Sequence, residues 1–177
     1  LEPIPGTEQQ IECDTLVLSV GLIPENELSM KCGVTIDPRT NGPIVDSHMQ
    51  TNVPGVFAAG NVTAIYDLVD YVSQAGDIAG REAARYVADV GRGKEPPQAT
   101  EQMVRLKTGQ NVRSVVPQEL DLSEYDPEHP PVLMLRSASL LERPVKVQMM
   151  NGDSSVMRFA EPYARPAEMI VKPLKQR

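Results

Sequence analysis

Residues 51–71 carry the side chains whose types and spacing could do chemistry. The apolar run of residues 56–59 ends abruptly at Gly60 and Asn61, and a short loop then leads to Asp70 and a predicted helix. A glycine lets the backbone come close to a bound dinucleotide. A short amide side chain can hydrogen-bond a hydroxyl or a phosphate oxygen. The pattern therefore predicts a stretch of backbone that contacts a dinucleotide.

Other reactive side chains are few and widely separated. Cys13 and Cys32 lie 19 positions apart and form no C-x-x-C pair, which argues against a redox disulfide and a zinc site. Cys13 precedes an apolar run, and we predict a buried core thiol there. His48 and His129 have no nucleophile or ligand at a meaningful spacing. We interpret both as solvated loop histidines and predict no catalytic residue and no metal ligand.

Length and charge limit the classes of protein and partner. The chain has 177 residues, 41% of them hydrophobic, enough for one domain or two small ones. Its net charge of −7 divides into −9 over residues 1–91 and +2 over residues 92–177. The acidic first half argues against a nucleic-acid partner. No membrane-length apolar run and no signal peptide occurs, so a cytoplasmic location is the default expectation.

Several elements are predicted before the second half of the chain. A near-continuous apolar run over residues 15–21 is typical of a buried parallel strand. One helical turn is predicted over residues 27–30, and Asn41-Gly42 is a hairpin-turn signal before a short strand at 43–46. Residues 56–59 are the next predicted strand. The first residues lack Met and lead straight into a strand, so we expect a piece of a longer polypeptide whose N-terminal remainder is its partner.

A helix of small residues is predicted from about Tyr71 to Val90. Asp70 or Ser73 could cap its start, and Gly91 could end it. Small side chains recur along two parallel rows, which lets a helix approach a sheet or a ligand closely. The two rows are Ala75, Ala79 and Ala83, and Gly76, Gly80 and Ala84.

The second half changes character. Residues 91–98, rich in Gly and Pro, are typical of a linker. Alternating or apolar runs then predict strands at 111–116, 132–137, 144–150, 155–159 and 169–172, with a turn at 151–153. Such strands with turns between them predict a small antiparallel β domain.

Residues 11–90 resemble the C-terminal stretch of FAD-dependent pyridine nucleotide–disulfide oxidoreductases, the class that includes thioredoxin reductase. The resemblance rests on Cys13-Asp14 with the run through Gly21, Pro24 and Asn26, residues 42–46, Thr51, residues 54–61 and Ala75-Gly76. It implies that residues 1–21 end an NAD(P)-binding insert. Residues 22–91 would be the C-terminal part of the FAD-binding domain, 92–110 a linker, and 111–177 a small β-rich C-terminal domain.

The implied fold class is an α/β partial FAD-binding (Rossmann-like) segment followed by a small antiparallel β domain. The resemblance implies that Gly60 and Asn61 contact the pyrophosphate and ribityl part of FAD. It also puts Asp70, Tyr71 and Val72 at a helix start under the flavin ring, where backbone N–H groups can stabilise the reduced flavin. The family usually has Asp at the second position, and Asn61 departs from that pattern. Asp70 fits a capping role better than a chemical one.

The resemblance implies a flavoprotein oxidoreductase that moves electrons from NAD(P)H, its co-substrate, through FAD to an acceptor. The tail resembles a bacterial branch of NAD(P)/FAD-dependent oxidoreductases. No G-x-G-x-x-G occurs, so neither nucleotide's phosphate cradle is encoded here, and the chain alone is expected to be inert. Two alternatives stay open. One is a non-catalytic assembly module whose β domain docks a partner subunit or a second copy, and the other is an α/β fragment with a coincidental motif.

Overall fold

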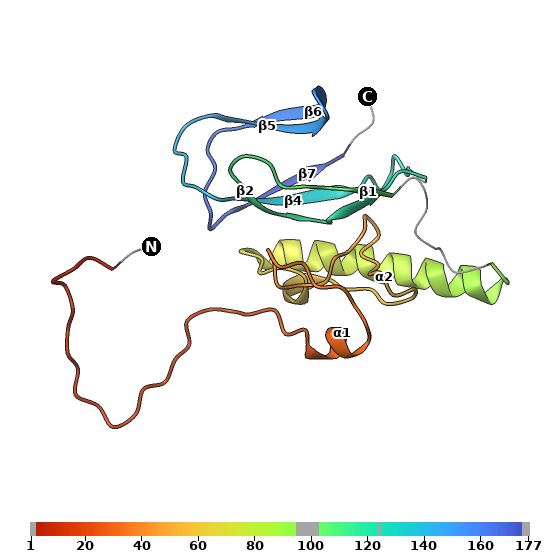
Figure 1. Ribbon diagram of the computed structural model, residues 1–177. Helices are drawn as coiled ribbons and strands as arrows, with labels where there is room; N and C mark the ends of the chain where they lie inside the picture. Colours follow the sequence, from red (N-terminus) through yellow and green to blue (C-terminus); the bar gives the residue numbers. More distant parts are fainter. Residues whose placement is uncertain (1–2, 95–102, 124, 175–177) are drawn as a thin grey trace.

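A computed structural model describes residues 3–94, 103–123 and 125–174 of the chain. Two α-helices and a short 3-10 turn come first, and the strands follow (Figure 1). The elements are α1 (Glu27–Lys31), η1 (Gly60–Val62), α2 (Val69–Gly91), β1 (Met103–Arg105), β2 (Val112–Val116), β3 (Glu119–Asp121), β4 (Val132–Ser137), β5 (Val145–Asn151), β6 (Ser154–Glu161) and β7 (Met169–Pro173).

Three layers are stacked in Figure 1. The β5–β6 hairpin lies over the antiparallel sheet β2-β4-β7, and α2 with the loops of residues 25–68 lies under that sheet. A third sheet, the pair β1 and β3, extends the strand layer at one end. Every strand pair between the elements described here is antiparallel.

Alternation along β4 explains why the sheet is covered on both faces. Leu133 and Leu135 point into one apolar cluster, which the β5–β6 hairpin completes with Val147 and Phe159. Met134, between the two leucines, points into the other cluster with Ala75 of α2. Successive side chains of a strand face opposite sides. The central strand therefore joins the hairpin layer to the helix layer.

The predicted β region is confirmed. The strands predicted at 111–116, 132–137, 144–150, 155–159 and 169–172 correspond to β2, β4, β5, β6 and β7. The turn predicted at 151–153 joins β5 to β6, where Asn151 pairs with Ser154. Sequence analysis missed β1 and β3, which have only three residues each. β1 falls within the predicted linker 92–110, of which residues 95–102 lie outside the described part. The domain boundaries stay a prediction.

The Rossmann-like arrangement predicted for residues 22–91 is not confirmed. The predicted strands at 43–46 and 56–59 form only isolated antiparallel bridges, such as Val45 with Thr51 and Gln50 with Phe57. The hairpin turn at Asn41 is confirmed, because that residue has a φ of +58° and Ile36 pairs with Pro43. The predicted helical turn is α1.

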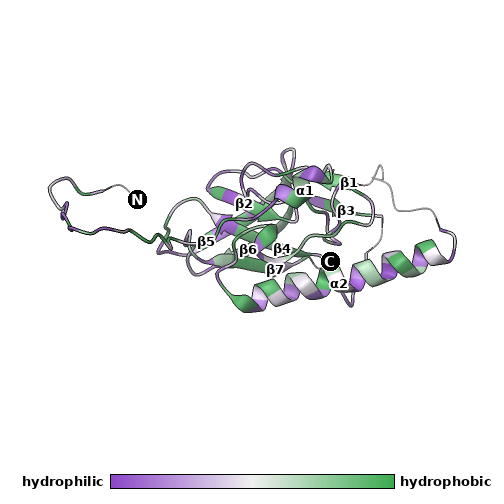
Figure 2. Ribbon diagram, turned by 90° about the horizontal axis from the view of Figure 1, so that it is seen from below, coloured by the Kyte–Doolittle hydropathy of each residue, from purple (hydrophilic) through white to green (hydrophobic). Residues whose placement is uncertain are grey.

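The strand predicted over residues 15–21 is wrong. This segment is extended and exposed, with Leu16 74% and Val20 91% accessible. A strand that is apolar on both faces needs neighbours on both sides, and no strand of the described residues pairs with it. Cys13 is exposed for the same reason, so the predicted core thiol is also wrong. Figure 2 shows apolar colour along this extended segment.

Helix α2 confirms the predicted helix, although its start differs. The N-cap position is Leu68, without a side-chain hydrogen bond, so the predicted caps Asp70 and Ser73 are wrong. Ala75 is fully buried against the sheet, whereas Gly76 and Gly80 are exposed. Polar and apolar residues alternate along the helix in Figure 2. Within the described residues, no helix is long and apolar enough to cross a membrane.

One core joins the two halves of the chain. Its buried members come from both sides of the predicted linker: Val45, Met49, Ala64, Tyr66, Ala75, Val116, Met134 and Met169. Gln118, the residue before β3, adds two hydrogen bonds across this junction. Its side-chain oxygen accepts the Val45 N–H at 3.0 Å, and its backbone N–H donates to the Val45 carbonyl at 3.1 Å. The loops of the first half are therefore fastened to the strands of the second.

Candidate functional site

Gly60 brings the backbone against the start of α2. It is buried and has a φ of +70°, a conformation that side-chain-bearing residues seldom adopt. A methyl group on Gly60 would lie 3.2 Å from Cγ1 of Val72. The structure thus brings together two of the predicted site residues, Gly60 and Val72, from the two ends of the loop between them.

Asn61 stabilises the turn that follows. Its side-chain oxygen accepts the N–H of Tyr66 at 3.1 Å. The Thr63 hydroxyl donates to the Gly60 carbonyl at 2.7 Å and lies 3.3 Å from the Tyr66 hydroxyl. Burial raises the pKa of the Tyr66 hydroxyl, and the contact with Thr63 opposes part of that shift. Residues 60–66 therefore form a closed loop whose polar groups are largely used internally.

The start of α2 holds the other predicted site residues. Tyr71 and Val72 are half-buried and pack against the core below the sheet, while Asp70 is exposed in the first turn. The N–H groups of Tyr71 and Val72 both donate to the Leu68 carbonyl, at 3.2 and 3.5 Å. A helix start leaves its first N–H groups without an intrahelical acceptor. Here those groups belong to Val69 and Asp70. They precede Tyr71 and Val72, the residues whose N–H groups are bonded to the Leu68 carbonyl.

Two side chains, Arg136 from β4 and Asp67 from the loop itself, fasten the loop between these two ends to the β region. We use "clamp" for the side chains of Arg136 and Asp67. Arg136 of β4 donates to the carbonyls of Ile65 at 2.7 Å and Pro166 at 2.8 Å. The Asp67 carboxylate accepts the Met169 N–H at 3.1 Å and lies 3.6 Å from the Arg136 guanidinium. Sequence analysis missed the clamp, because no local pattern links Arg136 to Ile65, 71 positions away, or Asp67 to Met169, 102 positions away.

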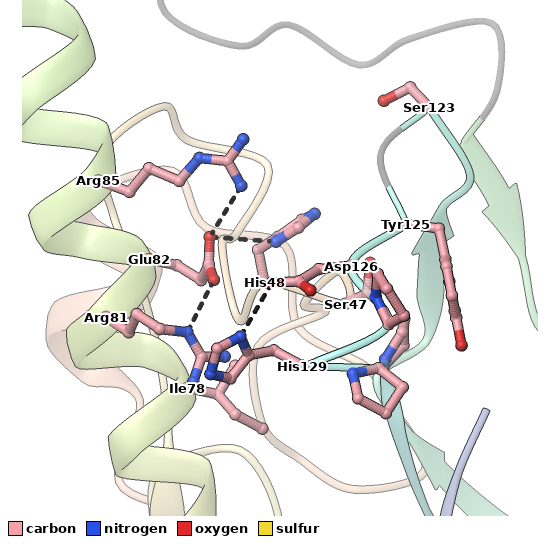
Figure 3. A pocket seen from close by; sticks show the side chains of 13 residues that line it. Ser47, His48, Ile78, Arg81, Glu82, Arg85, Ser123, Tyr125, Asp126 and His129 are labelled. Carbon is pink, nitrogen blue, oxygen red and sulfur yellow. Dashed lines mark hydrogen bonds and ion pairs between the residues drawn. The ribbon is translucent and has the colours of Figure 1, made fainter. Parts of the chain in front are cut away.

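A pocket of about 660 Å³ lies elsewhere, between α2 and the loop before β4 (Figure 3). The Glu82 carboxylate lies on the α2 side of this pocket. It lies 3.2 Å from Arg81 Nε, 3.8 Å from Arg85 Nη1 and 3.3 Å from His48 Nδ1. The other lining residues are Ser47, Ile78, Ser123, Tyr125, Asp126, Pro127, His129, Pro130 and Pro131.

Both histidines line this pocket, and each is paired with a carboxylate. His48 is only 27% exposed and joins its loop to α2 through Glu82, so the prediction of a solvated loop histidine is wrong for it. His129 is 47% exposed and lies 2.9 Å from Asp126, a contact that lowers the pKa of Asp126. Among residues 3–94, 103–123 and 125–174, no group of three or more His, Cys, Asp or Glu could hold a metal ion.

A buried glycine turn held against a helix start is an arrangement that lets backbone approach a dinucleotide. Residues 1–88 match the family model described as pyridine nucleotide-disulphide oxidoreductase. Through these residues the chain belongs to that family, and the predicted resemblance is confirmed.

Curated relatives share the same part of the chain. A thioredoxin reductase of Listeria monocytogenes is 38% identical over 90 residues, covering 49% of this chain and 27% of the relative. A ferredoxin–NADP reductase of Ignicoccus hospitalis is 37% identical over 82 residues, covering 46% and 27%. The mitochondrial dihydrolipoyl dehydrogenase of Caenorhabditis elegans is 43% identical over 58 residues, covering 32% and 12%. The chain thus spans about a quarter of the length of the first two. No solved structure matches it significantly.

Proposed function

We propose that this chain contributes the ribityl and isoalloxazine side of an FAD site in a flavoprotein oxidoreductase. That enzyme moves electrons from NAD(P)H through FAD to an acceptor. The observation that carries the proposal is the family match over residues 1–88, which includes both Gly60 and the start of α2. Two relatives over this stretch are named as a thioredoxin reductase and a ferredoxin–NADP reductase.

The geometry of the chain's own residues fits such a role. Gly60, whose positive φ suits a glycine, has no side chain to lie between its backbone and a ligand. The N–H groups of Val69 and Asp70 lie at the positive end of a 23-residue helix. Bound FAD would supply the redox chemistry. The chain would supply backbone donors and shape, and we assign no side chain a proton-transfer step.

The phosphate cradle must then come from other residues, because this chain contains no G-x-G-x-x-G. We expect the 177-residue chain alone to bind FAD weakly. The test is to purify both this chain and the full-length polypeptide that contains it, add FAD, and record flavin absorbance after gel filtration. Flavin retained by the full-length protein and lost by the chain agrees with the proposal. Stoichiometric retention by the chain alone would refute the half-site, and retention by neither would refute the flavoprotein.

Assembly through the β region is a second candidate function, favoured by one observation. The outer end of the β5–β6 hairpin exposes two apolar side chains, with Met150 50% and Val156 58% accessible. A partner subunit or a second copy could cover them. If the protein is monomeric, replacing both residues by Lys should leave its sedimentation coefficient unchanged. If it is assembled through this surface, the same replacements should dissociate the assembly. If an assembled protein keeps its mass after both replacements, the hairpin end is not its contact.

A further inference from the structure

The loop from Gly60 to Leu68 connects the two parts of the proposed flavin site. Gly60 and Asn61 lie at one end, and the N-cap of α2, Leu68, lies at the other. Within the loop, the Asn61–Tyr66 hydrogen bond closes only the first part. The distance between the two ends depends on what holds residues 65–67.

Those residues are held by the β region. Arg136 is 15% exposed and reaches the Ile65 carbonyl, one residue before the buried Tyr66. Asp67, one residue after it, receives the Met169 N–H on both carboxylate oxygens, at 3.2 and 3.1 Å. The loop is therefore attached to β4 and β7 on each side of an anchored tyrosine. Charge-assisted hydrogen bonds of this kind are stronger than neutral ones.

Strand β7 and the segment that precedes it also lie close to the helix start. A pocket of about 300 Å³ has Tyr71 on one wall and residues 161–165 and 168–172 on the other. Arg165, on that wall, is fixed by Glu142 at 2.9 Å and Glu168 at 2.6 Å. The segment that carries Pro166 and Met169, the backbone partners of the clamp, is thus itself held in place.

We propose that Arg136 and Asp67 are positioning residues that set the spacing between the two flavin-contacting ends. This inference rests on the proposed function and deepens it. It makes the β region a part of the flavin site's support, acting through the loop and not through contact with FAD. Released from the clamp, residues 65–68 would shift, and the first N–H groups of α2 would move relative to Gly60.

The test uses the full-length flavoprotein with Arg136→Gln and Asp67→Asn, singly and together. Arg158→Gln is the matched control, because Arg158 is exposed on β6, faces away from the loop and carries the same charge. We measure the FAD dissociation constant by flavin fluorescence, the flavin midpoint potential, and the unfolding of the apoprotein. Arg136→Gln should weaken FAD binding about tenfold, equivalent to about 1.4 kcal/mol, and lower the midpoint potential. The control should change neither.

Each outcome decides between the inferences. If the two substitutions act through one clamp, the double variant should bind FAD about as weakly as Arg136→Gln alone. Clamp variants that fold and keep the wild-type affinity and potential would overturn the positioning role while leaving the flavin proposal intact. If Arg136→Gln does not fold, Asp67→Asn decides, because Asn retains an acceptor for the Met169 N–H. A wild-type protein that binds no FAD would instead refute the proposed function.

Discussion

Gly42 is where two loops of the first half touch without any side chain between them. A methyl group at this position would overlap the carbonyl oxygen of Thr63 and lie 2.6 Å from its Cα. Thr63 is fully buried, and its hydroxyl donates a hydrogen bond to the Gly60 carbonyl in the same turn. The hairpin at Gly42 therefore supports the candidate site from behind, through backbone contact alone.

Replacing this glycine should be costly. Gly42→Ala forces the hairpin away from Thr63 and should lower the free energy of unfolding by about 3 kcal/mol, since the clash is with backbone that cannot rotate away. Urea unfolding followed by circular dichroism measures the change. Gly76→Ala is the control, because the added methyl group there would have no atom within 4 Å beyond the neighbouring residues and the backbone of its own helix. Equal stability of the two variants would contradict the close contact.

Asp46 gives the fold a pH dependence of predictable sign. Burial, the largest influence, raises the pKa of its carboxyl above the ordinary value of 3.8, although N–H donation from Gln50 and His48 opposes the shift. A carboxyl group whose pKa is higher in the folded protein than in the unfolded one stabilises the fold at low pH. That stabilisation is lost as the pH rises from the unfolded-state pKa through the folded-state pKa. Asp46 should therefore favour folding more at pH 3 than at pH 7.

Asp46→Asn isolates this effect. The Asp46 oxygen that accepts from His48 at 2.8 Å and from Gln50 at 2.9 Å has an equivalent in Asn, which carries no charge. Relative to the wild type, the variant should gain stability between pH 3 and pH 7, measured by urea unfolding at both values. Asp46→Ala should instead lose about 1–3 kcal/mol at both, because two N–H groups lose their acceptor. A stability difference between Asn variant and wild type that is independent of pH would rule out the burial argument.

At the scale of elements, the local sequence pattern predicted the helices and strands whose formation depends mainly on nearby residues. The helix from Val69 and the strands β2, β4, β5, β6 and β7 follow from periodicity and turn residues, and the structure contains them. The run of residues 15–21 has the composition of a strand, yet it pairs with no strand among the described residues. Composition alone could not predict this, because strand pairing depends on the neighbouring strands of a sheet. The same limit applies to the site. Gly60 is marked by its sequence context, whereas Arg136 acquires its role only through contacts across the fold.

Helix α2 has two rows of small residues, and only one of them is packed. Ala75 lies in the core, whereas Gly76 and Gly80 face solvent with open space around them. Glycine in a helix interior is less favourable than alanine by about 0.5–1 kcal/mol. Gly80→Ala should therefore raise the unfolding free energy of this chain by about that amount in urea. Destabilisation of the chain by this substitution would mean that the exposed row is packed in solution.

At the scale of the whole molecule, the shared core decides whether the β region can be separated. Met134, Val116 and Met169 from the strands bury Ala75 and Val45 from the first half. The Gln118 hydrogen bonds to Val45 and the clamp add polar links across the same boundary. An assembly role for the hairpin end is compatible with this arrangement, because Met150 and Val156 face away from the shared core.

Truncation tests this integration directly. A variant ending at residue 94 loses the sheet that packs on the apolar face of α2, and most helix stability in proteins comes from such packing. We expect partial helicity by circular dichroism and no cooperative urea transition. The matched control removes residues 1–23, and it should keep the wild-type transition midpoint, because the described part of that segment, residues 3–23, is exposed and contributes nothing to the two core clusters. A cooperative transition in residues 1–94 would show that the first half folds independently, and the β region would then be an appended unit.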